Sequence, residues 1–153
     1  SLSSYAGYVE FVMPQTDEVE AIERAFLDQV AKTPVDLKKY RAETLYGVGG
    51  SARAAAKLYA QMAGESCRPK TLTPEHFNAL LDLLENNPSK FAHLAARAVP
   101  ERIHTVGPVC VILGTLMQKL DAHKLEICKR GVREGYLIER MLGDAPCSRV
   151  KAQ

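Results

Sequence analysis

The sequence lacks the features that mark a membrane, secreted or strongly charged protein. Its 153 residues carry 20 basic and 18 acidic side chains, a net charge of +2, which is too mild to attract a nucleic acid or a membrane by bulk charge. It has no uninterrupted apolar run of about 18 residues that would span a bilayer, and we expect no signal peptide. We therefore expect a cytoplasmic protein with neither a membrane partner nor a specific nucleic-acid partner.

Residue groups that would make up a complete active site are also missing. Cys67, Cys110, Cys128 and Cys147 are scattered without a CxxC pair, which favours reduced thiols over disulfides. The four histidines show no metal-binding spacing such as HExxH. No Ser–His–acid or Cys–His trio can be assembled by spacing, so no catalytic residue is assigned.

The residues that are present suit one globular α/β domain. Hydrophobic residues make up 46% and charged residues 25% of the chain, and this length is enough for a proper core. The apolar periodicity and the capping residues predict strands that alternate with helices along the chain, which indicates an α/β architecture. Three strands are few, however, for a sheet that is covered on both faces. Strands are expected over residues 8–13, 44–48 and 124–128, and helices between Thr16 and Thr33 and over residues 52–63, 74–86, 89–98, 103–120 and 133–142.

The helix expected over residues 103–120 is apolar nearly all round, which indicates burial on most sides. Gly107-Pro108 lies inside it. We expect either a kink at this point or a helix that begins just before Pro108.

A glycine-rich turn between the strand at 44–48 and the helix at 52–63 is the best candidate for ligand binding. Gly49 and Gly50 permit a tight turn and a close approach of backbone to ligand, and Ser51 is a good N-cap. The free N–H groups of the first helical turn then form an anion pocket, for which phosphate is the common occupant. The alternative is a turn that binds nothing, since no full phosphate-loop signature is present.

Several charged residues have two interpretations each. Arg53 either reaches the same pocket as the glycines or is solvated. Arg133 either borders a cleft and attracts a polyanion or pairs with Glu134 or another neighbouring residue. For Arg102, a role in holding the start of a helix is favoured over a role in binding a ligand.

Four motifs carry a resemblance to a known family. They are YGVGGSARA at 46–54, LTPE at 72–75, VPERI at 99–103 and GVREGYL at 131–137. In this order and at these spacings the chain resembles the exopolyphosphatase/guanosine pentaphosphate phosphohydrolase (Ppx/GppA) family over roughly residues 8–142. The resemblance implies a partial ribonuclease H-like (actin-like ATPase) domain, in which few strands are flanked by helices.

The resemblance also implies a function and a domain arrangement. Members have two such domains, with the active site in the cleft between them, and hydrolyse a terminal phosphoanhydride of inorganic polyphosphate or guanosine pentaphosphate, usually with Mg²⁺. Residues 1–143 would be the second domain without its first β-hairpin, and residues 144–153 a flexible tail. The residues implied to bind phosphate or nucleotide are Gly49, Gly50, Ser51, Ala52, Arg53, Arg133 and Glu134.

The chain departs from the family in lacking the Asp-Gly-Gly-Gly type of hairpin and anything similar to the first domain. The family's catalytic glutamate and main metal-binding acids would therefore be missing, and we expect this chain alone to be inactive. We expect the missing N-terminal domain as a partner, and a homodimer, because an incomplete sheet exposes strand edges. A non-catalytic regulatory module that binds phosphate or nucleotide is the alternative.

Overall fold

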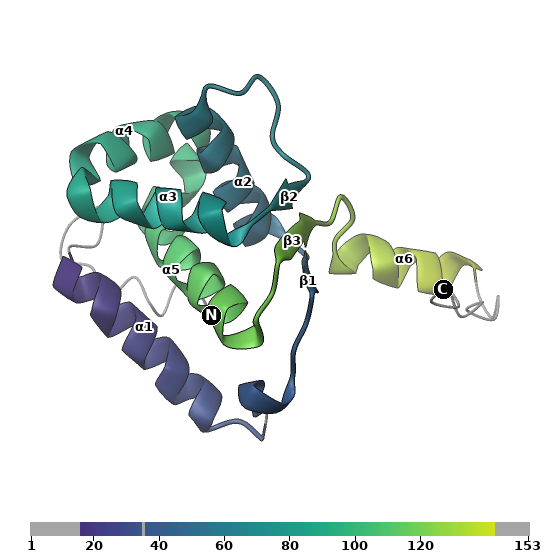
Figure 1. Cartoon of the computed structure of the whole chain (residues 1–153). Coiled ribbons are helices and arrows are strands. Elements are labelled where there is room, and N and C mark those ends of the chain that lie inside the picture. The colour runs from purple at the N-terminus through teal and green to yellow at the C-terminus, as the bar shows by residue number, and fades with distance from the viewer. Residues whose placement is uncertain (1–15, 35, 143–153) are drawn as a thin grey trace.

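A single long helix, α5 (Ile103–Leu120), runs through the middle of the protein and organises the other elements around it (Figure 1). The computed structural model describes residues 16–34 and 36–142. The strand expected at 8–13 and the tail at 144–153 lie outside these ranges. The remaining elements, in chain order, are α1 (Thr16–Ala31), η2 (Leu37–Lys39), β1 (Thr44–Gly47), α2 (Gly50–Ala63), β2 (Thr71–Leu72), α3 (Pro74–Asn86), α4 (Pro88–Ala98), η3 (Pro100–Arg102), β3 (Lys124–Ile127) and α6 (Val132–Leu142).

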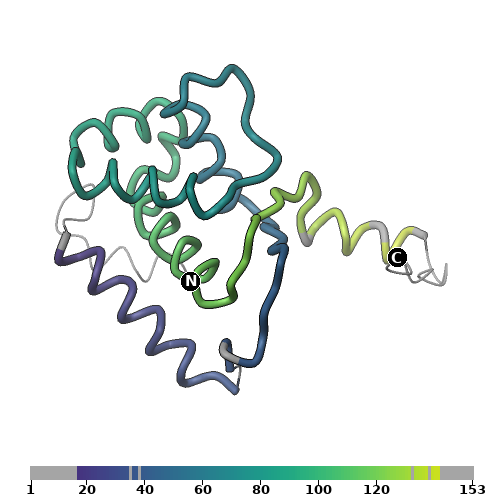
Figure 2. The backbone as a smooth tube through the Cα atoms, viewed as in Figure 1, coloured from purple at the N-terminus to yellow at the C-terminus, as the bar shows by residue number. Residues whose placement is uncertain are grey.

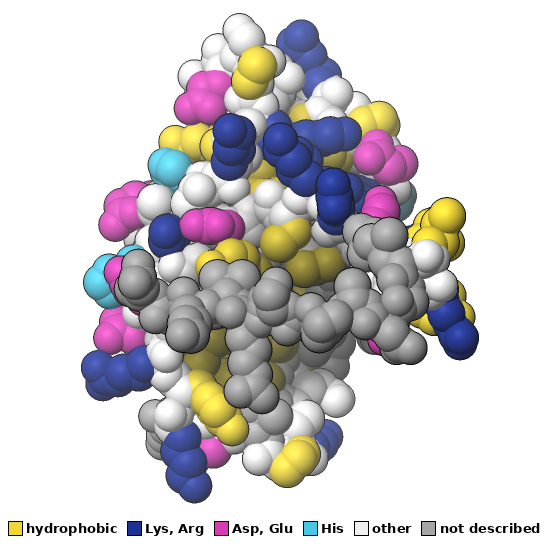
Figure 3. Space-filling view, turned by 90° about the vertical axis from the view of Figure 1, so that its right-hand side faces the viewer, with side chains coloured by type: hydrophobic (Ala, Val, Ile, Leu, Met, Phe, Trp, Pro, Cys, Tyr) yellow, Lys and Arg dark blue, Asp and Glu magenta, His cyan; other side chains and the backbone are white. Residues whose placement is uncertain are grey.

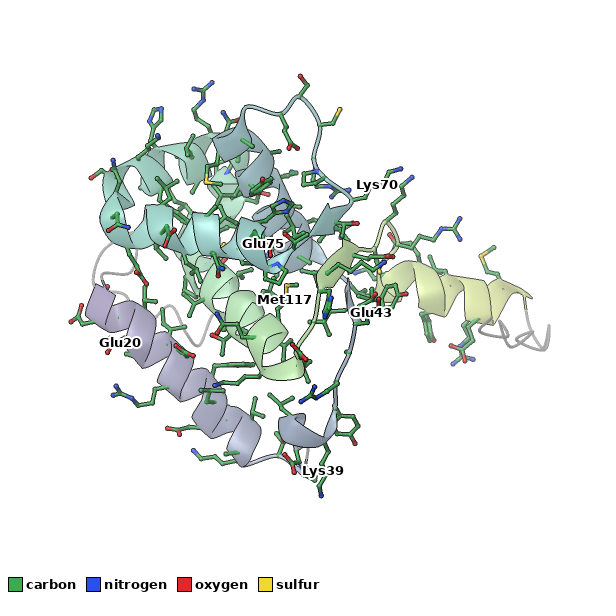
Figure 4. All side chains as sticks on the ribbon, viewed as in Figure 1. Glu20, Lys39, Glu43, Lys70, Glu75 and Met117 are labelled. Atoms are coloured by element: carbon green, nitrogen blue, oxygen red, sulfur yellow. The ribbon has the colours of Figure 1, made fainter. Side chains whose placement is uncertain are left out.

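Helix α5 is the core of the protein. Helices α1, α2, α3 and α4 all pack against it, and Val106, Cys110 and Met117 are almost completely buried. Figure 4 shows Met117 inside the body, whereas the labelled Glu20 and Lys39 lie at its periphery. Burial raises the pKa of the Cys110 thiol to about 12. The helix continues through Pro108 from Ile103, so a start just before the proline is the wrong alternative.

The apolar character of this segment has a structural explanation. By length and composition alone, Pro100–Leu120 could cross a membrane. However, 61% of its most apolar 18-residue window is buried inside the protein, as in the core helix of a globular domain.

The described sheet has three strands in the order β1-β3-β2, so β3 is the middle strand. Strands β1 and β3 run parallel with Leu45 opposite Leu125, and β2 runs antiparallel with Leu72 opposite the same Leu125. Leu125 and Ile127 are buried, while the alternate residues Lys124 and Glu126 form an ion pair of 3.1 Å. The α/β class with few strands flanked by helices is therefore confirmed. The two-residue strand β2 was not predicted, because it is too short to show a period.

The helices also agree closely with the sequence predictions. Thr73 is the N-cap of α3 and Pro74 its first residue, and the backbone N–H of Thr73 donates to Nδ1 of His76 at 3.3 Å. Helix α2 begins at Gly50, two residues earlier than expected. Its buried residues include Leu58 and Ala60, because α4 and α5 both pack on this helix.

Helix α6 extends away from the helical body (Figures 1 and 2). Its described side chains include three exposed apolar ones, Tyr136, Leu137 and Met141. The Nε atom of Arg140 donates to the hydroxyl of Tyr136 at 3.0 Å, which leaves Leu137 and Met141 as the more apolar part of the helix surface.

We predict that Gly47→Ala destabilises the protein by about 1–3 kcal/mol, as overpacking does in a well-packed core. A Cβ on Gly47 would lie 2.6 Å from the Cβ of Ala52, on the first turn of α2. Urea unfolding measures the effect, with Gly135→Ala as the control, because nothing lies within 4 Å of a Cβ added there. Equal stability of the two variants would contradict the close packing of β1 on α2.

Candidate functional site

The turn between β1 and α2 has a backbone shape that only glycine adopts readily. Gly49 has φ of 110° and ψ of −171°, a region that side chains with a Cβ rarely enter. The chain can therefore enter the helix immediately, and Gly49 itself is the N-cap residue while Ser51 lies inside the first turn. The prediction that Ser51 caps this helix is wrong.

The N-terminus of α2 has no side-chain cap among the described residues. Helix geometry gives the N–H groups of Gly50, Ser51 and Ala52 no partner within the helix. Among the described residues, no side chain hydrogen-bonds to this end as a cap. The unpaired donors lie at the positive end of the helix dipole, which favours an anion.

Arg53 fastens this turn to a second loop. Its Nε donates to the carbonyl oxygen of Gly49 at 3.1 Å, and its Nη1 donates to the carbonyl oxygen of Lys129 at 3.5 Å. These two carbonyls belong to the loops that follow the parallel strands β1 and β3. In α/β sheets, ligands bind beside the carboxyl ends of the strands, where such loops meet. Arg53 therefore contacts the turn through its backbone carbonyl, and a ligand role for Arg53 stays a prediction.

Arg102 reaches the same turn from a distant part of the sequence. A Cβ added to Gly50 would lie 2.8 Å from Cζ of Arg102, so the guanidinium packs directly on the bare backbone of this glycine. The short helix η3 places it there, just before α5 begins. The sequence favoured a role for Arg102 in holding the start of a helix. Nothing in the sequence predicted that its guanidinium contacts Gly50.

Gly50, Arg53 and Arg102 border a hollow of about 330 Å³, which is large enough for a phosphate group. Gly49, Ser51 and Ala52 are not among the residues that line it. Arg53, Lys57 and Arg102 supply positive charge to its lining, and Glu101 is the carboxylate among the lining residues. Lys and Arg side chains gather in the upper half of the face seen in Figure 3. With three cations and one acid beside an open helix N-terminus, the hollow is built to attract anions.

Glu134 and Arg133, the other two predicted site residues, lie at the start of α6. One carboxylate oxygen of Glu134 accepts the N–H of Gly131 at 2.8 Å, so this side chain caps α6. Hydrogen bonds from its own N–H and from Gly131 hold the pKa of Glu134 below its usual value, and nearby Arg53 and Arg133 lower it further. Arg133 is exposed and is not among the residues that line the hollow; a ligand role for these two stays a prediction.

The described residues offer few ligands for a metal ion. In the part of the chain that the structure describes, no three His, Cys, Asp or Glu side chains come together to hold one. Glu101 is the carboxylate among the described residues that line the hollow, and Mg²⁺ in phosphoryl-transfer sites takes one or two carboxylates together with substrate phosphates. A Mg²⁺ ion at this place would therefore take most of its ligands from a substrate and from water, while the described residues supply N–H and guanidinium groups that suit an anion.

Comparison with known proteins gives a match to one family and to one solved fold. No curated protein sequence matches the chain. The fold matches the crystal structure of the *Aquifex aeolicus* member of the Ppx/GppA protein family with a TM-score of 0.69 and 18% sequence identity. The match covers 93% of this chain and 46% of that one, so the chain spans about half the length of this relative. The sequence itself matches the Ppx/GppA phosphatase family over residues 6–143, and the chain therefore belongs to the Ppx/GppA phosphatase family.

Proposed function

We propose that this chain is the phosphate-holding half of a phosphohydrolase that releases terminal phosphate from inorganic polyphosphate. The observation that carries the proposal is the open N-terminus of α2, flanked by Arg53 and Arg102. Family membership supports a phosphatase type of activity. Polyphosphate as the substrate and the release of terminal phosphate by the intact protein are parts of what we propose.

In this proposal the chain acts by electrostatic stabilisation. The N–H groups of Gly50 and Ser51 and the guanidinium of Arg102 hold phosphoryl oxygens and offset the negative charge that develops on them during transfer. The positions of these donors are fixed by the turn and by η3 before any ligand arrives. Activation of water is assigned to a glutamate outside this chain, and any Mg²⁺ to carboxylates outside it, since the described residues supply no ligand set.

The proposal includes a partner for the exposed parts of the sheet. Strand β1 lies at one edge of the described sheet, and its Tyr46 is 67% exposed. The chain spans about half the length of the *Aquifex aeolicus* relative. We therefore assign the missing N-terminal domain, with the first β-hairpin, as the partner that completes the second actin-like domain and the cleft. A homodimer is the other expected association, because unpaired strand edges favour pairing between chains.

Two alternatives follow from the same site. Guanosine pentaphosphate is also a phosphoanhydride, and the Gly50 hollow alone does not select against it. A non-catalytic module that binds phosphate or nucleotide is favoured by a different observation, namely that Glu101 is the one carboxylate among the described residues that line the hollow. A substrate comparison on an intact two-domain protein separates the two enzymes, and the activity of that protein separates both from the module.

We predict that the purified 153-residue chain binds tripolyphosphate weakly and hydrolyses no polyphosphate. The N–H donors and cations of the site are present, but the described residues include no cluster of three His, Cys, Asp or Glu side chains for a metal, and the proposal assigns activation of water to a glutamate outside this chain. Calorimetry measures binding, and an assay for released phosphate with added Mg²⁺ measures hydrolysis. Phosphate release by this chain alone would contradict the proposal that this chain binds phosphate while residues outside it activate water.

We predict that Arg102→Gln weakens tripolyphosphate binding about tenfold, because a hydrogen bond to a charged group contributes about 1.5 kcal/mol or more. Arg24→Gln on the exposed face of α1 removes the same charge far from Gly50 and serves as the control. Urea unfolding of both variants separates lost binding from lost packing. An equal loss of affinity in the two variants would show that Arg102 acts only through net charge.

A further inference from the structure

Two loops diverge where the pairing of β1 with β3 ends. Within the described residues, the backbone hydrogen bonds between these strands end with the N–H of Cys128, which donates to the carbonyl oxygen of Gly47 at 2.9 Å. Beyond this bond, one chain turns through Gly49 into α2, and the other continues through Lys129 towards α6 (Figure 1). Arg53 donates to a carbonyl oxygen of each loop just past this point.

The guanidinium of Arg53 suits this bridge. Its Nε reaches the carbonyl oxygen of Gly49 at 3.1 Å and its Nη1 that of Lys129 at 3.5 Å. A guanidinium holds its N–H donors in one rigid plane, so that one side chain can hold two acceptors at a fixed separation. Because Arg53 lies near the start of α2, the bridge joins the N-terminus of this helix to the loop after β3.

The bridge also reaches the start of α6. The carboxylate of Glu134 accepts the N–H of Gly131 at 2.8 Å. Hydrogen bonds from its own N–H and from Gly131 lower the pKa of Glu134 most, and the positive charge of Arg53 lowers it further. Arg53 therefore interacts with both ends of the segment between β3 and α6, namely a carbonyl at Lys129 and the carboxylate that caps α6.

Direct contact with phosphate is the competing role for Arg53, because this side chain also lines the hollow at Gly50. Its Nε and Nη1, however, already donate to backbone carbonyls. A ligand that took these two donors would leave the carbonyls of Gly49 and Lys129 without them, at a cost in free energy. Lys57 and Arg102 supply positive charge to the hollow separately.

We propose that Arg53 is a positioning residue, which holds the first turn of α2 to the loop between β3 and α6 so that the N–H groups of Gly50 and Ser51 keep the orientation in which they bind phosphate. This inference rests on the proposed function, in which those N–H groups and Arg102 hold the phosphoryl oxygens. Because Arg53 acts through two backbone carbonyls, its contribution depends on the planar fork of the guanidinium and not on positive charge alone.

Arg53→Lys is the decisive variant, because it keeps the charge and removes the fork. Lysine binds phosphate well as a point charge, so a direct ligand role predicts nearly unchanged affinity for tripolyphosphate. The positioning role predicts that Arg53→Lys and Arg53→Gln both weaken binding about tenfold, the scale of one misaligned hydrogen bond to a charged group. Calorimetry on the full 153-residue chain measures the affinities. Arg24→Lys, the same exchange at an exposed site on α1, is the control.

Two NMR measurements separate positioning from a general loss of stability. In the unaltered chain, tripolyphosphate should shift the Nε–H signal of Arg102 and leave that of Arg53 nearly unmoved. Without any ligand, Arg53→Gln should raise the pKa of Glu134 towards its usual value, because a neighbouring positive charge is lost. Urea unfolding of each variant checks that the chain remains folded.

Unchanged affinity in Arg53→Lys would overturn the positioning role and leave the Gly50 site standing. So would a shift of the Arg53 Nε–H signal as large as that of Arg102. An unchanged pKa of Glu134 in Arg53→Gln would overturn the extension of the bridge to α6. If the unaltered chain binds no tripolyphosphate, the proposed function itself fails, and this inference fails with it.

Discussion

The close contact between the end of β1 and the first turn of α2 is the constraint on which the rest of the site depends. Gly47 approaches Ala52 so closely that a single added carbon would lie 2.6 Å from the alanine Cβ. This contact sets the open helix N-terminus beside the carboxyl ends of β1 and β3. Arg53 then ties together the loops that follow these two strands. The glycines of this turn thus leave the space that the side chains of Arg53 and Arg102 occupy.

Among the described residues, the cations that line the hollow at this turn outnumber the carboxylates beside them, which are Glu101 in the same lining and Glu134 near Arg53. Arg102 packs on the backbone of Gly50, and Lys57 continues the positive charge along α2. Gathering like charges costs folding free energy unless an anion binds between them. Their presence beside open N–H donors agrees with membership of a phosphatase family. In the proposed function, this chain supplies phosphate binding, and the base and the metal ligands belong to the remainder of the intact protein.

The sequence predicted most of the fold because local signals were strong. Thr73-Pro74-Glu75 marked the start of α3, and the long apolar segment marked α5 as buried. Ser51 was misassigned because Gly49 adopts a positive φ and lets the helix begin earlier. The meeting of Arg102 with Gly50 could not be predicted, since it depends on how α4 and η3 pack against α2. The short strand β2 depends on tertiary packing as well.

The central claim is that the free N–H groups at the start of α2 hold phosphate oxygens. An NMR titration of the ¹⁵N-labelled chain with tripolyphosphate tests it most directly. The account predicts that the largest saturable shifts fall on the amides of Gly50, Ser51 and Ala52, with smaller shifts along α2. Shifts confined to exposed lysines and arginines elsewhere, with these three amides unmoved, would contradict it.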